Sequence, residues 1–467
     1  MSDADPSGSG ADPDAGRGVE PTDPGADEGF EPVDVFPDSD DFDLRPGSDS
    51  CYKCSTCDTN CPVAEVDDDF PGPKFQGPEQ WRLKQNEDDY GIDESVMDCS
   101  NCMRCDNACP AGVPLSQMHN TARGQYVSDE MSRFSRKYLR NRVLANYRLF
   151  ARLGSKVPRL SNALLNNRAV QWLNERLLGI TGEREFPSFA AETFREWWTA
   201  RGGAAASREH AATARERRGE PRDADKRVAY FHGCYANYNT PEVARATVRV
   251  FEWFGYEVAV PEQGCSGTPM FANGMLGDAR RHAETNVASL SALAERGYDA
   301  VASCTSCSMA LRQEYPELFD IDGIEAAAAH TFEAVEYLRI HEDLRDAVAD
   351  AEVDDDSAAE FVYHAPCHAR NQGLARQSLE LFRELDGVDI EDAGDSCSGI
   401  SGTYGWKADK YETSMAIGEE MFDHMEAAAG ETGMTECPTC AMQMEHGTGY
   451  EIRHPLELLE AALVDDG

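Results

Sequence analysis

The sequence has no long apolar run. A membrane-spanning helix needs about 18 to 20 consecutive apolar residues, and no segment of the 467-residue chain reaches that length. The first residues, MSDADPSGSGADPDAG, also lack the basic and apolar regions of a secretory signal peptide. These two absences predict a protein on the cytoplasmic side of the cell, without a transmembrane helix and at most peripheral to a membrane.

Positive charge is scarce as well. The chain has 85 acidic but only 43 basic residues, which gives a formal net charge of −42. This balance argues against a nucleic-acid partner, because binding to a phosphate backbone requires a cationic surface. Repulsion among so many acidic side chains is screened within about 3 Å at 1 M salt. The composition therefore predicts a halophilic protein, adapted to a salt-rich cytoplasm.

Cysteine, in contrast, is abundant, with 16 residues in the chain. Disulfide frameworks belong mainly to small secreted domains. A long chain without a leader peptide does not fit that class, so the cysteines are expected to bind metal.

Two short motifs share one cysteine spacing. Residues 51–62 read CYKCSTCDTNCP and residues 99–110 read CSNCMRCDNACP, so each is C-x2-C-x2-C-x3-C-P. This spacing is typical of ferredoxin-type [4Fe-4S] sites, in which the fourth cysteine binds the other cluster. The alternatives are uncrossed ligand sets and a pair of zinc knuckles, although zinc sites rarely use three evenly spaced cysteines closed by Cys-Pro. The crossed sets are Cys51, Cys54, Cys57 with Cys109, and Cys99, Cys102, Cys105 with Cys61.

The other eight cysteines form two sets with nearly equal spacing, and each set spans 73 residues. Each has one cysteine after an apolar strand-like segment, one in a C-S-G turn and a C-x2-C pair after another such segment. The agreement predicts two copies of one α/β unit. Four thiols suit either a [4Fe-4S] cluster or tetrahedral zinc, so the spacing leaves the metal open. The two sets are Cys234, Cys265, Cys304, Cys307 and Cys367, Cys397, Cys437, Cys440.

These patterns predict an α+β, multi-domain chain. It consists of an α-helical ferredoxin-type domain with two [4Fe-4S] clusters, followed by two repeated α/β cysteine-rich units. The first segment is rich in Asp, Glu, Pro, Gly and Ser and is expected to be a disordered acidic tail. The expected segments are the tail at 1–50, the ferredoxin-type domain at 51–130, a basic and aromatic helical segment at 131–203, a linker at 204–226 and the repeats at 227–345 and 346–467.

Several phrases around these cysteines resemble a known family. They are FPGPKFQGP at 70–78, FHGCYANYN at 231–239, CSGTPMFANG at 265–274, YHAPCH at 363–368 and CSGISGTYGWK at 397–407. They are similar to the cysteine-rich domain of heterodisulfide reductase subunits and of glycolate and lactate oxidase iron-sulfur subunits. Above all they look like the iron-sulfur subunit of anaerobic glycerol-3-phosphate dehydrogenase, and the likeness extends over about residues 50–465.

The resemblance implies an electron-transfer role in anaerobic glycerol metabolism. A flavoprotein dehydrogenase would oxidise sn-glycerol 3-phosphate, and this chain, without catalytic activity of its own, would pass the electrons to a membrane quinone. One alternative is the equivalent subunit of a lactate or glycolate oxidase or of a heterodisulfide-reductase-like complex. A zinc-held interaction scaffold is the other.

The chain departs from the family pattern in both C-S-G turns. The family typically has C-C-G there, whereas this chain has Ser266 and Ser398. Losing one thiolate per turn argues against the five-cysteine cluster of the disulfide-reducing relatives. A four-cysteine cluster in each repeat is preferred, with zinc or an empty site in at least one repeat as the alternative. Histidines near these ligands, His232, His364 and His368, are expected to pack at strand ends rather than to bind metal.

One stretch is basic, in contrast to the acidic chain as a whole. Between Met131 and Asn174 there are ten basic residues and no acidic one, interleaved with aromatic and aliphatic side chains such as Phe150 and Trp172. Basic helices with apolar side chains suit the surface of an anionic membrane. The stretch therefore predicts a peripheral membrane contact, and the alternative is that its cations neutralise acidic neighbours within the fold.

Overall fold

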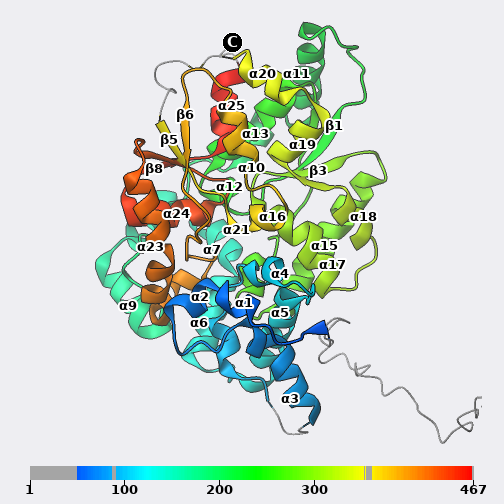
Figure 1. Cartoon of the computed structure of the whole chain (residues 1–467). Coiled ribbons are helices and arrows are strands. Elements are labelled where there is room, and N and C mark those ends of the chain that lie inside the picture. The colour runs from blue at the N-terminus through cyan, green and yellow to red at the C-terminus, as the bar shows by residue number, and fades with distance from the viewer. Residues whose placement is uncertain (1–49, 87–90, 352, 354–359, 465–467) are drawn as a thin grey trace, which may run out of the picture. The chain divides into compact units, whose positions relative to one another are not determined.

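Two small parallel sheets organise the second half of the protein (Figure 1). The computed structural model describes residues 50–86, 91–351, 353 and 360–464. The strand orders are β2-β1-β3-β4 and β6-β5-β7-β8, and every strand pair is parallel. This identical order agrees with the predicted repeat. The strands are β1 (Arg227–Phe231), β2 (Glu257–Ala259), β3 (Asp299–Ala302), β4 (Thr331–Glu333), β5 (Glu360–Tyr363), β6 (Asp389–Asp392), β7 (Thr432–Met434) and β8 (Glu451–Arg453).

Helices cover both sheets. Their connections return each chain segment to the same sheet edge, as parallel strands require. In the first repeat they are α12 (Tyr235–Tyr238), α13 (Pro241–Trp253), α14 (Thr268–Phe271), α15 (Leu276–Ala294), α16 (Thr305–Met309), α17 (Tyr315–Leu318), α18 (Ile324–Ala329), α19 (Ala334–His341) and α20 (Leu344–Ala349). In the second they are α21 (Cys367–Asn371), α22 (Gln377–Phe382), α23 (Tyr411–Ala427), α24 (Pro438–Thr448) and α25 (Pro455–Leu463).

The two repeats share a hydrophobic core. The central strands β1, β3 and β5 are almost entirely buried, which is why they read as continuous apolar runs. One cluster of buried side chains joins Tyr230 and Val301 of the first repeat to Phe361, Tyr363 and Met434 of the second. The repeats therefore pack as one body.

The cap residues of two helices also cross between the repeats. Glu333 caps α19 and accepts a hydrogen bond from Gln377 Nε2 of the second repeat at 2.6 Å. His454 caps α25, and its Nε2 lies 2.8 Å from the carbonyl oxygen of Ser303 in the first repeat. Helix α25 packs along α13, with Arg249 paired to Glu460. Each repeat therefore completes part of the other.

The N-terminal domain is helical and contains the two ferredoxin-type motifs. Lys53 and Ser55 in the first motif, and Asn101 and Met103 at the equivalent positions of the second, have positive φ angles near 60°. Residues other than glycine rarely adopt this left-handed backbone conformation, and they keep it where the surrounding structure stabilises it. Here it bends each turn so that three thiols share one side. The helices are α1 (Thr56–Thr59), α2 (Pro62–Val66), α3 (Gln80–Asn86), α4 (Arg104–Ala108) and α5 (Leu115–Gln125).

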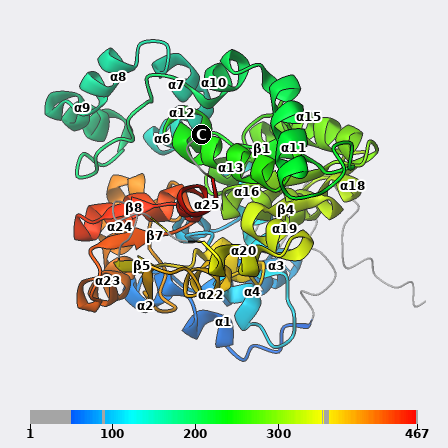
Figure 2. The ribbon, with the colours of Figure 1, turned by 90° about the horizontal axis from the view of Figure 1, so that it is seen from above.

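Four amphipathic helices follow, and α8 and α9 lie at the periphery, away from the sheets (Figure 2). None of the eight described residues of α8 is buried, and Gln171 is the single buried residue in α9, which is described throughout. In the described residues, no helix is both long and apolar enough to cross a membrane. The helices are α6 (Arg136–Ala145), α7 (Tyr147–Gly154), α8 (Pro158–Leu165) and α9 (Arg168–Leu178), followed by α10 (Phe194–Ala200).

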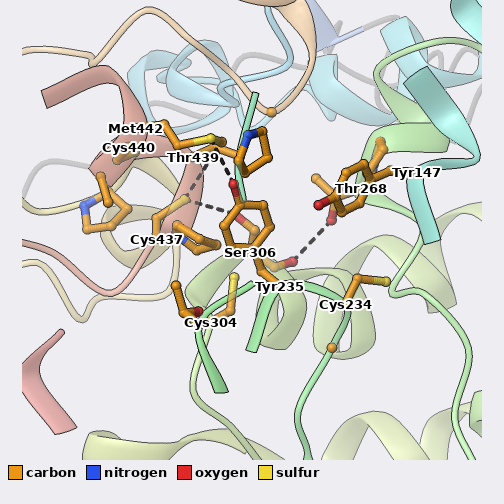
Figure 3. Close-up of a pocket in the computed structure, with 18 of the residues that line it drawn as sticks. Tyr147, Cys234, Tyr235, Thr268, Cys304, Ser306, Cys437, Thr439, Cys440 and Met442 are labelled. Carbon is orange, nitrogen blue, oxygen red and sulfur yellow. Dashed lines mark hydrogen bonds between the residues drawn. The ribbon is translucent and has the colours of Figure 1, made fainter. Parts of the chain in front are cut away.

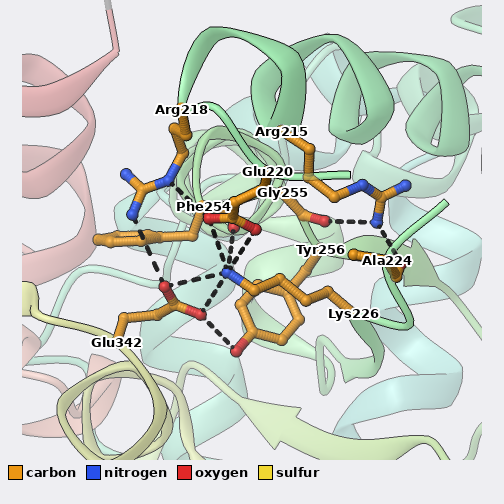
Figure 4. A network of polar contacts seen from close by, with 9 residues as sticks. All are labelled: Arg215, Arg218, Glu220, Ala224, Lys226, Phe254, Gly255, Tyr256 and Glu342. Carbon is orange, nitrogen blue, oxygen red and sulfur yellow. Dashed lines mark hydrogen bonds and ion pairs between the residues drawn. The ribbon is translucent and has the colours of Figure 1, made fainter. Parts of the chain in front are cut away.

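The segment expected to be a linker is mostly helix. Residues Gly203–Arg217 form α11, and Arg215 donates hydrogen bonds to the carbonyl oxygens of Ala224 and Gly255, each at 2.9 Å (Figure 4). Beyond the helix, Lys226 pairs with Glu342 at 3.0 Å. The polar sequence concealed this packing because the buried side of α11 uses small residues and an arginine stem rather than large apolar side chains. The predicted tail at 1–50 lies, except for Ser50, outside the described residues.

Candidate metal centres

The first ferredoxin-type set gathers around one small cavity, and we call it site A. The lining residues include Cys51, Cys54, Cys57 and, from the second motif, Cys109. The backbone N–H of Val113 points at Cys109 Sγ at 3.4 Å. The structure thus brings together the four thiols of the crossed set, and their role as ligands stays a prediction.

The second set, site B, comprises Cys99, Cys102, Cys105 and Cys61. Burial raises the pKa of Cys105 well above its usual range, and the charges of Asp106 and of the other three thiols raise it further. The pKa of Cys99 is lowered to about 6, because a hydrogen bond with His119 and the charge of Arg123 outweigh its burial. His119 is held by the carbonyl oxygen of Pro73, 2.9 Å from its Nε2. His119 and Arg123 therefore favour the thiolate form of Cys99, whereas burial disfavours it at Cys105.

The remaining eight cysteines line one cavity of about 860 Å³ between the repeats. Figure 3 shows part of this lining and labels Cys234, Cys304, Cys437 and Cys440. The first cysteine and the C-x2-C pair of each set follow the carboxyl ends of strands, at β1 and β3 in one repeat and at β5 and β7 in the other. Open parallel sheets bind ligands outside these ends, where the strand order reverses. We call the first-repeat set, Cys234, Cys265, Cys304 and Cys307, site C and the second-repeat set, Cys367, Cys397, Cys437 and Cys440, site D.

Sites C and D have matching internal contacts. Cys234 hydrogen bonds with Cys265, and the equivalent pair, Cys367 and Cys397, has its sulfurs 3.7 Å apart. Cys304 and Cys437 contact their own C-x2-C partners and also contact each other across the repeats. The two predicted sets are therefore contiguous rather than isolated.

The serines of the C-S-G turns also occupy equivalent places. Cys307 Sγ lies 3.3 Å from Ser266 Oγ, and Ser398 Oγ lies 3.3 Å from Cys440 Sγ. A serine hydroxyl thus contacts the second thiol of the C-x2-C pair in both repeats. Among the described residues, no three His, Cys, Asp or Glu side chains are arranged to hold a single metal ion.

Site D lies against site B. Cys61 and Cys397 belong to one buried apolar cluster, with Cys99, Cys102 and Cys367 packed against it. Burial and the charge of Cys397 raise the pKa of Cys102. Asn371 Nδ2 of α21 donates to the carbonyl oxygen of Cys102 at 3.2 Å, and so fastens the second repeat to the site B turn. The cysteines of the N-terminal domain and of the second repeat thus meet directly.

Site C lies against the basic helical segment. Arg148 of α7 points its Nη1 at Cys234 Sγ at 3.7 Å and its Nη2 at the carbonyl oxygen of Gln263 at 2.6 Å. The pKa of Cys234 falls to about 7, through the hydrogen bond with Cys265 and the charge of Arg148, despite burial. Sequence patterns alone do not single out this arginine among the ten cations of its stretch.

The chemistry of the lining fits a sulfide-bearing cluster. Both ring nitrogens of His364, Nδ1 of His368 and the hydroxyls of Thr305 and Thr435 are buried without a hydrogen-bond partner among the described residues. Buried polar groups are almost always hydrogen-bonded. These groups flank the cysteines, and the inorganic sulfides of an iron-sulfur cluster accept such bonds. His368 and Thr435 line the cavity itself, so the eight thiols with these unpaired polar groups beside them are a suitable donor set for such clusters.

Comparison with known protein families gives matches for the N-terminal domain and for both repeats. A 4Fe-4S dicluster domain matches residues 47–113, and a cysteine-rich domain matches residues 228–312 and 361–445. The C subunit of anaerobic glycerol-3-phosphate dehydrogenase from Escherichia coli (strain K12) is 32% identical over 424 residues, which are 89% of this chain and 98% of that protein.

Two further relatives match about half of the chain. The B subunit of fumarate reductase (CoM/CoB) from Methanothermobacter marburgensis is 29% identical over 51% of this chain and 47% of its own length. Lactate utilization protein A from Exiguobacterium sp. is 28% identical over 51% of this chain and 96% of its own length.

Proposed function

Because this chain belongs to the family of the iron-sulfur electron-transfer subunit of anaerobic glycerol-3-phosphate dehydrogenase, we propose that it carries electrons from a flavoprotein to a membrane quinone. The flavoprotein would oxidise sn-glycerol 3-phosphate to dihydroxyacetone phosphate. The observation that carries the proposal is the continuity of the cysteine sites, from A and B through D to C.

Each part of this series has a distinct task. Iron-sulfur clusters held by cysteine thiolates supply one-electron chemistry when bound. The residues of this chain fix where they lie: the left-handed turns aim the thiols of sites A and B, and Cys102 sets site B against site D. Arg148 and Arg104 place positive charge beside sites C and D, which favours the more negative, reduced state.

The donor is tested by anaerobic co-purification and assay. The complex isolated through this chain is expected to contain a flavoprotein and to reduce a naphthoquinone with sn-glycerol 3-phosphate. Lactate and glycolate are the matched alternative donors, favoured by the relative that acts in lactate utilization. If lactate reduced the complex and glycerol 3-phosphate did not, the proposed donor would be wrong and the electron-transfer role would stand.

The metal is tested by iron, sulfide and zinc analysis of the same preparation. About 16 iron atoms per chain are expected if sites A to D each hold a [4Fe-4S] cluster, and about 8 if sites A and B alone do. Zinc without acid-labile sulfide after anaerobic reconstitution would overturn the electron-transfer role itself.

Helices α7 to α9 supply the proposed membrane contact. The structure divides nine of the ten cations of this stretch into two groups, and the tenth, Arg133, is exposed ahead of α6. Arg136, Lys137, Arg140, Arg142 and Arg148 bond to groups within the fold. Arg152, Lys156, Arg159 and Arg168 are exposed and form no ion pair with any residue that the structure describes. Part of the stretch therefore neutralises internal partners, and the outward part suits anionic lipid.

Exposed apolar side chains occur in the same segment as the outward cations. Leu160 is 60% exposed, Trp172 63% and Leu177 61%. Contiguous exposed apolar side chains mark interaction surfaces. A bilayer is the occupant that combines an apolar layer with anionic groups, and a quinone-reducing subunit has to reach one. We call this surface the α7–α9 face, formed by Leu149, Phe150, Leu153, Val157, Leu160, Leu164, Trp172, Leu173 and Leu177 with the four cations.

Vesicle flotation tests this contact. At high salt, where charge attraction is screened within about 3 Å, Leu160→Ser with Trp172→Ser should lower binding to anionic vesicles about tenfold or more, because buried apolar area carries the affinity. Arg152→Gln with Arg159→Gln should lower vesicle binding less. The difference between the two double variants should become smaller as the salt concentration is lowered. Ile340→Ser, at an equally exposed leucine-sized side chain on α19, is the matched control. Equal flotation of all variants would contradict a membrane contact at this face.

A further inference from the structure

The cavity between the repeats has an apolar lining in addition to its cysteines. Sites C and D line the space of about 860 Å³. Apolar side chains of the basic helical segment line it as well, and we call the part that they line the apolar compartment: Val143, Leu144, Tyr147, Leu165, Leu178 and Phe186. Ligand pockets in proteins have this form, an apolar lining with a few polar groups. An apolar compartment that opens onto redox centres suits an apolar redox substrate.

The compartment is covered by the same helices that bear the α7–α9 face. Leu165 lines the cavity, while its neighbour Leu164 is 51% exposed on the outer surface. Phe150 belongs to both surfaces, since it lines the cavity and is 44% exposed. With no buried residue in the eight described residues of α8, the cover is thin. A lipid-soluble molecule could pass from the membrane surface to the compartment beside Phe150.

A hydrogen-bond donor, the hydroxyl of Tyr235, lies between the apolar compartment and the cysteines. Tyr235 follows Cys234, and its hydroxyl donates to the thioether of Met442 at 2.9 Å (Figure 3). A thioether sulfur is a weak acceptor, so a carbonyl oxygen would be a better partner for this hydroxyl. Tyr147 stacks beside Tyr235 with ring centroids 6.1 Å apart and fixes its position. The donor is thus oriented and only weakly engaged.

The cavity also has a route for protons. Glu242 of α13 and Glu457 of α25 both line it. Glu242 is exposed, whereas Glu457 is half-buried and accepts a hydrogen bond from the backbone N–H of His454 at 2.9 Å. Reduction of a quinone to a quinol consumes two electrons and two protons. The cavity lining thus combines the thiols with two carboxylates, one of which, Glu242, is exposed to water.

From this arrangement we propose that the apolar compartment is the quinone site, reached from the α7–α9 face past Phe150, with the Tyr235 hydroxyl donating to a quinone carbonyl oxygen. The proposal rests on the proposed quinone reduction. Two electrons arrive from site C, two protons arrive through Glu457, and quinol leaves by the apolar route. The membrane contact at the α7–α9 face and the quinone site beneath it would then act together.

The test uses the reconstituted full chain without its flavoprotein, so that it does not depend on the donor. The chain is reduced with dithionite, freed of excess reductant and mixed with 2,3-dimethyl-1,4-naphthoquinone, and reoxidation is followed by stopped-flow absorbance. Leu144→Trp fills the compartment and should slow reoxidation at least about tenfold, because overpacking excludes the ligand. Leu139→Trp, at an exposed side chain of the same helix, α6, and outside the α7–α9 face, is the matched control and should leave the rate within about twofold.

Tyr235→Phe is the second variant, since it keeps the ring and removes the donor. It should lower the second-order rate about fivefold, which is the effect of one neutral hydrogen bond. Reoxidation by ferricyanide should stay at the parent rate in all three variants, which shows that the sites are intact. Parent rates with naphthoquinone for Leu144→Trp and Tyr235→Phe would overturn the quinone site. A parent chain that reduces ferricyanide but no naphthoquinone would instead contradict the proposed function.

Discussion

The two cysteine-rich repeats have the same fold and different neighbours. Site D of the second repeat packs against Cys102 of the N-terminal domain, whereas site C of the first repeat packs against Arg148 of α7. Their internal contacts match, down to the serine that meets a thiol at 3.3 Å in each. Duplication of one unit thus explains why the two cysteine sets match, and the neighbouring elements give the two sites different surroundings. Under the proposed function, site D would receive electrons from the N-terminal domain, and site C would deliver them toward the α7–α9 face.

The largest difference should appear when the arginine at each site is neutralised. Arg148→Gln removes a charge at Cys234 and two hydrogen bonds that fasten α7 to the loop at 263–264. We expect the reduction potential of site C to fall by roughly 50 mV, about 1 kcal/mol for one electron, with a lower melting temperature. Arg104→Gln, which acts on site D from α4 and also on Cys102 of site B, should shift those two sites and leave site C unchanged. Redox titration followed by electron paramagnetic resonance distinguishes the two, and Arg148→Lys controls for charge.

A glycine that occurs in only one repeat gives the next effect. Gly233 has φ +67°, and a Cβ there would lie 3.1 Å from Cys307 Sγ. Gly233→Ala should therefore lower stability by about 1–2 kcal/mol and loosen site C. In the second repeat Ala365 and Pro366 precede Cys367, so Ala365→Gly is the matched change there and should leave site D intact. Anaerobic melting curves with cluster absorbance measure both, and equal loss from the two sites would contradict this asymmetry.

The caps that cross between the repeats predict a pH effect. Burial and the charge of Glu436 raise the pKa of Glu333 to about 8. The free energy of unfolding that its protonated form supports is complete below about pH 4.5 and is lost as the pH rises toward 8. Glu333→Gln imitates the protonated form, so it should raise stability at pH 8 by at least about 1 kcal/mol and change little at pH 5. Glu325→Gln, exposed on α18, is the control, and a gain that did not depend on pH would count against this explanation.

The smallest effect concerns the serines of the C-S-G turns. Ser266 and Ser398 contact Cys307 and Cys440 at the same distance. Hydrogen bonds to cluster sulfurs raise the reduction potential, so Ser266→Ala and Ser398→Ala should each lower the potential of their own site by a similar small amount. Redox titration of the two single variants is the measurement. A shift in the reduction potential of one site only would show that the neighbouring elements, and not the shared C-S-G turn, determine the effect of the serine.

Much of this comparison could be predicted from the sequence, because local patterns encode local geometry. Cysteine spacing predicted the crossed sets at sites A and B and the repeat of sites C and D, and strand-like apolar runs predicted the α/β units. The contact between Cys102 and Cys397 joins positions far apart in the chain, and no local pattern encodes such a pair. The linker at 204–226 was predicted from its polarity, whereas α11 packs through Ala211, Ala212 and the stem of Arg215.

The basic stretch shows the same limit. Its charge and apolar content predicted a peripheral membrane contact, which stays a prediction, and α7 to α9 do expose both cations and apolar side chains. Individual arginines could not be assigned, because Arg148, which is partly buried, and Arg152, which is exposed, occupy similar sequence surroundings. Their roles depend on which elements pack against each turn of helix.

The central claim is the order of the sites, with D before C. It is tested most directly in the complex with its flavoprotein, reduced anaerobically by glycerol 3-phosphate, frozen within milliseconds and examined by electron paramagnetic resonance. In a Cys397→Ala variant, which breaks site D, sites A and B should be reduced while site C stays oxidised. In a Cys234→Ala variant, which breaks site C, sites A, B and D should all be reduced and quinone reduction should stop. Rapid reduction of site C in the Cys397→Ala variant would contradict the account.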